Sequence, residues 1–452
     1  MSPKRIRIVV LDDDPTGIQT VHGCYLLTSW EPDRLRAALE DELPFFYVLT
    51  NTRAYRRERV QHIVAEVVDN VLTANKTLGH PLVFVSRSDS TLRNHFPAEV
   101  NTILHGLESH GAESVDAVFL VPAFIECGRI TVGDTHYLVE GDRRIPVSET
   151  EFARDSVFGY RTSRLPNYIE EKTGGKVRAE NVSSIPLEWL RSPGKSQFRG
   201  SDGAMVLNRK LDGFLHKLVN RAHVVVNAEN YDDLNCFATA VLRQVGDGKR
   251  FIFQSAGSLI KALAEVPDRP LLGKEIVDRT GPGLFVVGSH VTKTSSQLSR
   301  LLESPSVQGV EIDVAEVLKS GDTLKPMLLK RIEALWQQDR VPVIFTSRSE
   351  LRFESKEERL RAGESISHFL AGLVRGLPFK PSFLVSKGGI TSHDILVRGV
   401  EVRQARVLGQ FLPGVPVIRT PADSPKPGIP YIIFPGNVGD ENSLLRVLQI
   451  LT

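Results

Sequence analysis

The sequence predicts an α/β protein with two domains, each a largely parallel sheet flanked by helices. Its 452 residues exceed what a single hydrophobic core usually serves. Short apolar, β-branched runs alternate with segments of helical periodicity, which is typical of parallel sheets covered by helices. Small, polar and charged residues follow nearly every predicted strand, and open α/β sheets bind their ligands at these carboxyl ends.

The predicted elements alternate along the chain. We expect strands at residues 6–11, 45–49, 82–85, 117–121, 224–226, 251–253, 284–287, 341–345, 383–385 and 431–434. We expect helices at residues 32–42, 56–75, 232–245, 292–303, 324–338 and 354–374. Pro and Gly accumulate between residues 265 and 283, which predicts a first domain at 1–265, a linker at 266–283 and a second domain at 284–452.

Composition favours small-molecule partners. The chain is 41% hydrophobic and 24% charged with a formal net charge of +2, and Lys and Arg are interspersed with Asp and Glu. This pattern predicts neither a nucleic-acid partner nor a membrane partner, while a homo-oligomer is compatible with it. Three widely separated cysteines and the lack of an apolar leader or membrane-spanning run favour the cytoplasm.

The first strand ends in three consecutive aspartates, Asp12, Asp13 and Asp14, followed by a Pro-Thr-Gly turn. Neighbouring carboxylates in a low-dielectric site repel each other, so something must neutralise or use them. The open alternatives are a metal ion, a basic side chain, a substrate hydroxyl and the backbone N–H groups of the turn. Asp14 or Thr16 is suited to cap that turn, which leaves at least one carboxylate for another role.

A second polar cluster, SRSDSTLRN, follows the strand at 82–85 and is expected to open a helix. Ser90 and Thr91 offer hydroxyls, Asp89 a carboxylate, and Arg87 and Arg93 planar cationic forks that suit a carboxylate or phosphate. An anion would also gain from free N–H groups at a helix N-terminus. Together with Arg53, which follows the strand at 45–49, this cluster predicts a ligand that is anionic at one end and rich in hydroxyls at the other.

Glycine-rich turns follow three strands of the second half. They contain Gly288 and Ser289, then Gly388, Gly389 and Thr391, and finally Gly436, Asn437 and Gly439. Three such turns in one sheet indicate a site for nucleotide phosphates, although each turn alone is weak support. The sequence lacks a Walker A loop, a GxGxxG motif and the protein-kinase motifs.

Taken together, these motifs resemble the four-carbon acid sugar kinase family of threonate, erythronate and oxo-tetronate kinases. Asp13 to Gly17 is similar to its DDLTG motif, Arg87 to Asn94 to KxDSTLRG, and Pro122 to Phe124 with Gly128-Arg129 to PAF...GR. The three glycine-rich turns are similar to its GS, GGET and SGNFG motifs. The departures include Pro15, Arg87, Asn94, Ile390 and the Phe434-Pro435 pair.

The resemblance implies a sugar-acid-binding N-terminal domain, an ATP-binding C-terminal domain and phosphoryl transfer in a ligand cleft between them. The implied catalytic residues are Asp13, Asp14 and Asp89, and the implied substrate-binding residues are Arg53, Arg87, Ser90, Thr91, Arg93 and Arg129. The implied nucleotide-binding residues are Ser289, Gly388, Gly389, Ile390, Thr391, Gly436 and Asn437. One of the three aspartates would orient or deprotonate the substrate hydroxyl, and Mg²⁺ would bridge the ATP phosphates, with its protein ligands unknown.

Two other functions fit parts of the sequence. LDDDPT also matches the DxDx[TV] motif of haloacid-dehalogenase-like phosphatases, with Asp12 as nucleophile and Asp14 as acid/base. That function lacks matching downstream Lys and acidic motifs and leaves the glycine-rich second half unused. The altered GGIT and FPGN turns would instead suit a non-catalytic protein that binds an acid sugar.

Overall fold

The computed structural model describes residues 4–191, 208–348 and 355–452. The chain divides into two compact units, Met1–Asp268 and Arg269–Thr452. In the described part of the chain, no helix is both long enough and apolar enough to cross a membrane.

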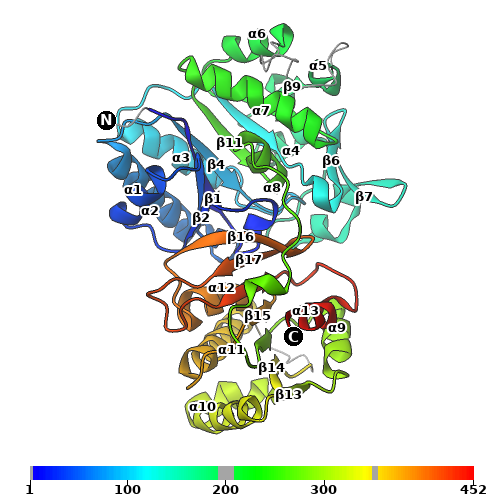
Figure 1. Ribbon diagram of the computed structural model, residues 1–452. Helices are drawn as coiled ribbons and strands as arrows, with labels where there is room; N and C mark the ends of the chain where they lie inside the picture. Colours follow the sequence, from blue (N-terminus) through cyan, green and yellow to red (C-terminus); the bar gives the residue numbers. More distant parts are fainter. Residues whose placement is uncertain (1–3, 192–207, 349–354) are drawn as a thin grey trace. The chain divides into compact units, whose positions relative to one another are not determined.

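The first unit contains a sheet whose eight strands all pair in parallel (Figure 1). Their spatial order is β2 (Tyr25–Leu27), β3 (Phe45–Leu49), β1 (Arg7–Asp12), β4 (Leu82–Arg87), β11 (Phe251–Ser255), β5 (Ala117–Val121), β10 (Ala222–Val226) and β9 (Ser183–Ile185). The central strands are buried on both faces, as parallel strands covered by helices must be. Because every strand runs the same way, all eight carboxyl ends meet at one edge.

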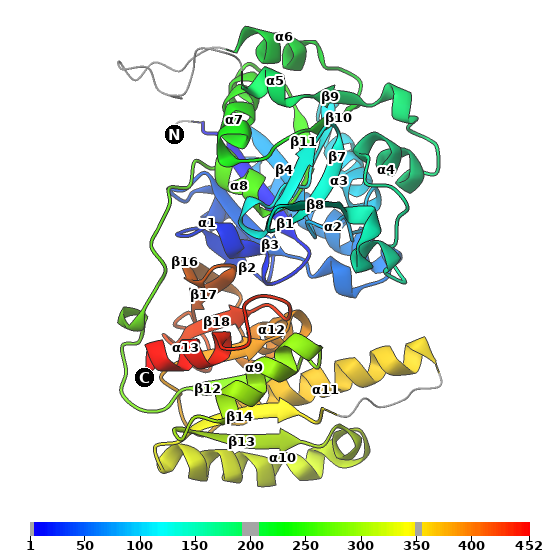
Figure 2. The ribbon, with the colours of Figure 1, turned by 90° about the vertical axis from the view of Figure 1, so that its right-hand side faces the viewer.

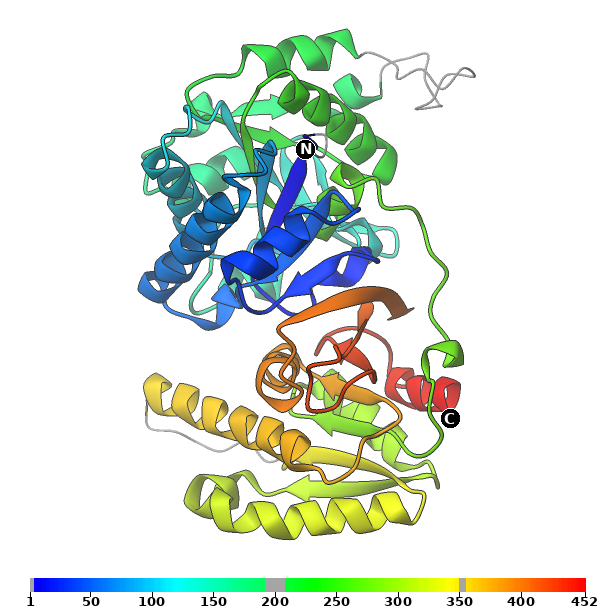
Figure 3. The same ribbon diagram turned by 60° about the vertical axis from the view of Figure 1, so that its left-hand side comes forward.

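Helices cover both faces of this sheet, as Figures 1 and 3 show. The bounds in the first unit are α1 (Pro32–Leu39), α2 (Arg57–Asn75), α3 (Ala98–Ser109), α4 (Leu165–Lys172), α5 (Leu187–Leu190), α6 (Arg209–Lys217), α7 (Tyr231–Gly246) and α8 (Gly257–Leu263). Apolar side chains of α1, α2 and α3 share one core with Val9, Leu11 and Phe84 of the sheet. On the other face, Phe237 of α7 packs edge-on against Phe119 of β5.

A small antiparallel sheet is inserted into the first unit after β5. It consists of β6 (Arg129–Val132), β7 (Thr135–Glu140) and β8 (Arg143–Pro146), in that order. The β7–β8 pair is the hairpin that the run THYLVEGDRRIPV predicts. His136 and Leu138 of β7 are buried, whereas the intervening Tyr137 lies on the other face of the strand.

The second unit contains a mixed sheet of seven strands (Figure 2). Their order is β13 (Val307–Ile312), β14 (Val341–Thr346), β12 (Leu284–Val287), β15 (Leu384–Lys387), β18 (Pro430–Phe434), β17 (Val415–Arg419) and β16 (Gln404–Leu412). The first five are parallel, and β17 is antiparallel to both β18 and β16. The helices are α9 (Thr292–Leu302), α10 (Val314–Gln337), α11 (Lys356–Gly376), α12 (Gly389–Asp394) and α13 (Ser443–Leu451), and α9 and α13 share one core with the sheet.

The predicted α/β class with largely parallel sheets is confirmed, and several details of the prediction are wrong. The helix expected directly after SRSDST begins only at Ala98, so Asp89 and Arg93 lie in a loop rather than at a helix N-terminus. The helix predicted at 324–338 begins at Val314, where Asp313 caps it, and continues past an irregular residue at Ser320. The start predicted for the helix at 354–374 lies outside the described residues.

Candidate functional site

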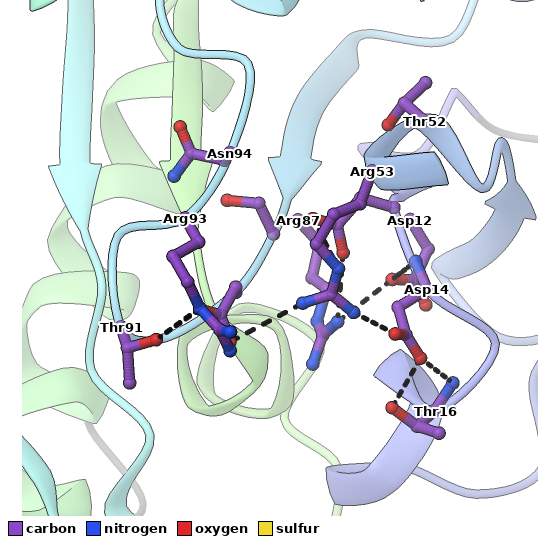
Figure 4. A network of polar contacts seen from close by, with 12 residues as sticks. Asp12, Asp14, Thr16, Thr52, Arg53, Arg87, Thr91, Arg93 and Asn94 are labelled. Atoms are coloured by element: carbon purple, nitrogen blue, oxygen red, sulfur yellow. Dashed lines mark hydrogen bonds and ion pairs between the residues drawn. The ribbon is translucent and has the colours of Figure 1, made fainter. Parts of the chain in front are cut away.

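The ends of β1 and β4 place the two polar clusters of the first unit side by side. The parallel register sets Asp12 opposite Arg87, and the backbone N–H of Asp13 donates to the carbonyl of Arg87 at 3.2 Å. On the other side of β1, Asp12 is opposite Leu49, so the chain that follows β3 brings Arg53 to the same edge. Figure 4 shows Arg53 between the two clusters.

Asp12 is completely buried, and its contacts hold the strand ends at this edge of the sheet together. Its Oδ1 lies 3.2 Å from Nη1 of Arg87, and its main-chain carbonyl accepts bonds from Thr50. A Cβ on Gly17 would lie only 2.0 Å from Oδ2 of Asp12, so glycine is required where the turn passes this carboxylate. A side chain so enclosed is unsuited to be the nucleophile of the phosphatase alternative.

Asp13 is the carboxylate without a hydrogen-bond donor. Its side chain is 2% exposed, and neither oxygen has a hydrogen-bond partner among the described residues. Its nearest cations stand at longer range, with Oδ1 3.5 Å from Arg87 and Oδ2 4.0 Å from Arg53. Burial raises the pKa of the Asp13 carboxyl to about 7, and Arg53 and Arg87 only partly offset this rise. Burial also raises the pKa of Asp12 to about 7, and the charge of Asp12 adds to the rise in the pKa of Asp13.

Asp14 and Asp89 both accept hydrogen bonds, and both lie within ion-pair distance of Arg53. Asp14 accepts bonds from the backbone N–H and the hydroxyl of Thr16, which closes the turn, and it forms an ion pair with Arg53. Nη1 of Arg53 lies 3.6 Å from Oδ1 of Asp89. Arg53 therefore links the two clusters (Figure 4). Its side chain remains 24% exposed, so it can also meet a ligand.

Arg93 and Thr91 complete the environment of Asp89. Nε of Arg93 donates to Oδ2 of Asp89 at 2.8 Å, and the Thr91 hydroxyl donates to the same oxygen. Although burial opposes it, Arg93 and Arg53 together hold the pKa of Asp89 at about 2. Arg93 also lies over the ring of Phe152, and a quarter of its side chain is exposed.

Three side chains from residues 128–175, which we call the inserted segment, hold the loop that carries this cluster. Nε2 of His136 donates to the Ser90 carbonyl at 2.8 Å, and the hydroxyls of Tyr160 and Tyr168 donate to the Thr91 and Leu92 carbonyls at 2.7 and 3.0 Å. Leu92 has a φ of +66°, a backbone conformation that a branched side chain rarely adopts. Burial lowers the pKa of His136 to about 4, which keeps the ring neutral. The sequence indicated the hairpin, but nothing in it predicted these bonds.

The remaining predicted residues of the first unit lie less centrally. Ser90 is buried next to Asp89. Arg87 is 5% exposed and is held by Asp12 and Asp13, which disfavours direct contact with a substrate. Arg129 begins β6, and its guanidinium donates to the carbonyl of Cys127 rather than to any described carboxylate.

In the second unit, the three glycine-rich turns lie against one another. A Cβ on Gly288 would lie 2.0 Å from the Thr391 hydroxyl, and one on Gly388 would lie 2.9 Å from Cβ of Ser289. Gly388 also has a φ of +110°, which L side chains rarely adopt. A Cβ on Gly436 would lie 3.4 Å from Oγ of Ser289. The structure therefore brings the predicted residues of the second half together, and close packing explains at least part of their need for glycine.

Polar side chains surround these turns, and an apolar one is exposed beside them. Arg348 donates to the carbonyl of Ser289 at 2.7 Å, and the Thr294 hydroxyl donates to Oγ of Ser289 at 3.2 Å. Ile390, which replaces the acidic residue of the resembled motif, is 64% exposed. Asn437 is also exposed, at the tip of its turn.

Comparison with known proteins assigns the chain to a family. A model described as sugar-binding N-terminal domain matches residues 8–263, and one described as nucleotide-binding C-terminal domain matches residues 284–444. The chain belongs to the four-carbon acid sugar kinase family. A family relative, a D-erythronate kinase from Heliobacterium modesticaldum, is 28% identical over 314 residues, covering 68% of this chain and 63% of the relative. The match therefore spans less than two thirds of that relative.

Two solved structures of bacterial proteins have a similar fold. A protein from Salmonella typhimurium LT2 has a TM-score of 0.66 at 16% identity, over 97% of this chain and 98% of its own. A DUF1537 protein from Haemophilus influenzae has a TM-score of 0.62 at 15% identity, over 98% of this chain and 100% of its own. At these identities the likeness concerns the fold alone.

Proposed function

We propose that this protein transfers a phosphoryl group from ATP to a hydroxyl of a small sugar acid, such as threonate, erythronate or an oxo-tetronate. Membership of the acid sugar kinase family supports the reaction class. The observation that favours catalysis is Asp13, a buried carboxylate at a strand end whose oxygens lack a hydrogen-bond donor among the described residues. Such a group is available to accept a hydrogen bond, and then a proton, from a substrate hydroxyl.

The environments of the aspartates favour Asp13 as the base. A base for phosphoryl transfer must accept a proton near neutral pH, and burial raises the pKa of Asp13 to about 7. The pKa of Asp89 is held at about 2, so this carboxylate is a poor proton acceptor at neutral pH. Asp14 is occupied by Thr16 and Arg53. We assign Asp14 and Asp89 to holding Arg53 and Arg93 in place and to accepting hydrogen bonds from other substrate hydroxyls.

Arg53 and Arg93 are the proposed ligands of the substrate carboxylate. Both are about a quarter exposed, whereas Arg87 is almost completely buried. Planar guanidinium groups bind carboxylates in a defined orientation, which would place the sugar hydroxyls toward Asp13. Nucleotide binding by the second unit is proposed from the family model and from the packed glycine-rich turns.

Mg²⁺ is proposed to arrive with ATP. The described residues contain no group of three or more His, Cys, Asp or Glu side chains arranged to hold a metal ion. Mg²⁺ in phosphoryl-transfer sites is commonly held by substrate phosphates, water and only one or two carboxylates, so this arrangement fits it. When bound, the ion would neutralise phosphate charge.

The test compares conservative variants at two aspartates. Asp13→Asn should lower kcat with the best sugar acid about 10²- to 10⁴-fold, the usual effect of removing a general base. Asp212→Asn is the matched control, because Asp212 is also buried and paired with an arginine, Arg243, but lies on α6. Full turnover by Asp13→Asn would contradict the assignment. ATP binding without any ATP consumption would favour the non-catalytic alternative.

A further inference from the structure

Side chains of β15 and α9 donate hydrogen bonds to the backbone carbonyls of the turn that follows β18. We call residues 435–440 the 435–440 loop. Its carbonyls accept bonds from Nζ of Lys387 and from side chains of α9. The bonds are Lys387 to Pro435 at 2.6 Å and to Val438 at 3.4 Å, Thr294 to Gly436 at 3.1 Å, Lys293 to Asn437 at 3.2 Å, and Gln297 to Val438 at 3.1 Å and Asp440 at 2.7 Å. Thr294, Gln297 and Lys387 are themselves completely buried.

The N–H groups of the same loop are left available. Among the residues that the structure describes, none accepts a hydrogen bond from the backbone N–H of Gly436, Asn437, Val438 or Gly439. These residues are half-buried or exposed, so a ligand can reach the loop. Successive N–H groups that face one way form a concave site for an anion, and glycine permits close approach of the ligand.

Lys387 is a buried cation without a carboxylate partner. It ends β15, directly before the glycine pair of the second turn, and no described carboxylate lies within ion-pair distance of its ammonium. Besides the two carbonyls, its ammonium contacts the face of Phe434 at 4.1 Å. Burying a charge is costly unless it is paired, and two neutral carbonyls compensate only part of that cost. An anion bound nearby would supply the missing compensation.

We propose that Lys387 is a positioning residue for nucleotide phosphate. Its ammonium anchors the carbonyl side of the 435–440 loop, so that the N–H groups of Gly436–Gly439 face a phosphate, and its buried charge attracts that phosphate. This inference deepens the proposed nucleotide site of the second unit and rests on it. Neither the family motifs nor the sequence pattern had assigned Lys387 a role.

Proton uptake should accompany nucleotide binding. Burial, and then the neighbouring Lys293, lower the pKa of Lys387 to about 7, so much of the free protein lacks this charge above pH 7. A bound phosphate favours the charged form, so binding above pH 7 draws in a proton. Among the described charged side chains nearby, Lys293 donates to the Asn437 carbonyl and Arg348 to the Ser289 carbonyl. The flanking strand β12 is apolar, β18 carries only Tyr431, Asp394 of α12 faces Arg398, and Arg446 of α13 binds Asp440.

Calorimetry of Mg-ATP binding to the full chain tests this proposal. We compare wild type, Lys387→Met and Lys426→Met between pH 7.0 and 8.5, in buffers of different ionisation enthalpy. Lys426 is the matched control, because its buried ammonium donates to the Leu377 carbonyl in the same unit, away from the 435–440 loop. The binding heat of wild type should depend on the buffer, and its affinity should fall as pH rises.

Lys387→Met should bind about tenfold more weakly, the effect of one charge-assisted interaction, and should lose the pH dependence. Lys426→Met should behave as wild type. Equal affinity and equal proton uptake in wild type and Lys387→Met would overturn the role of Lys387 alone. Failure of wild type to bind Mg-ATP at millimolar concentration would instead overturn the proposed nucleotide site. If Lys387→Met misfolds, the wild-type measurement still tests the proposal, because binding heat that does not depend on the buffer would show that no proton is taken up.

Discussion

Two aspartates of one network in the first unit have pKa values that are shifted in opposite directions. Asp13 and Asp89 are both buried, yet the pKa of Asp13 is raised to about 7 and that of Asp89 is held at about 2. The difference arises because Arg93 and Thr91 donate directly to Asp89, whereas no described group donates to Asp13. The residue type alone could not have distinguished them, because the same side chain serves as a proton acceptor or as an anchor according to its donors.

The raised pKa of Asp13 predicts a specific dependence of stability on pH. The folded-state pKa lies above the usual value of 3.8, so between pH 4 and pH 7 the folded protein binds more protons than the unfolded chain. The free energy of unfolding should therefore fall as pH rises through this window, by at most about 1.4 kcal/mol per unit of pKa shift. Asp13→Asn lacks this penalty, so its stability relative to wild type should increase from pH 4 to pH 7. A pH-independent difference in denaturant unfolding would contradict the assignment.

Gly17 is predicted to be required for packing against Asp12. An added Cβ would approach Oδ2 of Asp12 to 2.0 Å, and the buried carboxylate has little room to move. Gly17→Ala should lower the free energy of unfolding by about 1–3 kcal/mol, as overpacked cores do. Gly213→Ala is the control, because Gly213 lies inside α6 with open space around it, and it should be neutral or stabilising. Equal denaturant midpoints for both variants would refute the packing argument.

At the scale of elements, the buried parallel strands were predictable and the less regular elements were not. Residues 45–49, 117–121 and 284–287 form the predicted strands without change, because each is a continuous apolar run. The strands β13, β16 and β17 were missed. In β16 buried residues alternate with more exposed ones, and in β13 Gln308 and Glu311 are exposed, so neither strand has a continuous apolar run. The loop before α3 could not be predicted either, since its form depends on bonds from residues far along the chain.

The inserted segment is predicted to set the geometry of the Asp89 loop. Tyr160→Phe removes the donor to the Thr91 carbonyl and should raise KM for the sugar acid more than it lowers kcat, because Thr91 and Arg93 hold Asp89. Tyr137→Phe is the control, because Tyr137 lies in β7 on the face of the strand opposite to buried His136 and Leu138. Steady-state kinetics with saturating ATP measure both constants. An unchanged KM in Tyr160→Phe would show that the loop does not depend on this bond.

At the scale of the whole molecule, the order of motifs along the chain predicted the family, and the family models now confirm it. The structure also gathers most of the predicted site residues at strand ends within each unit. The sequence did not reveal the contacts of three side chains, those of Arg87, Arg129 and Lys387. The first two contact protein groups, so their predicted binding of substrate stays a prediction, and the third ends an apolar strand and was not singled out. Which side chains face inward depends on register and packing, and one sequence does not reveal these.

Each ligand should stabilise the protein on its own, since each is proposed to bind a different unit. A ligand at a hundredfold its Kd adds about 2.7 kcal/mol of stability, so Mg-ADP and the best sugar acid should each raise the Tm. Arg93→Met should abolish the shift caused by the sugar acid and keep the shift caused by Mg-ADP, because Arg93 lies in the first unit. Loss of both shifts in this variant, measured by thermal unfolding, would contradict separate sites.

Phosphorus NMR of the protein with Mg-ATP and a panel of four-carbon sugar acids tests the proposed reaction most directly. We expect ATP to be converted to ADP together with a new phosphomonoester signal, only when a sugar acid of the panel is present, and much more slowly with Asp13→Asn. Absence of ATP consumption with every sugar acid, or release of phosphate from a phosphorylated sugar acid without any nucleotide, would contradict a sugar-acid kinase.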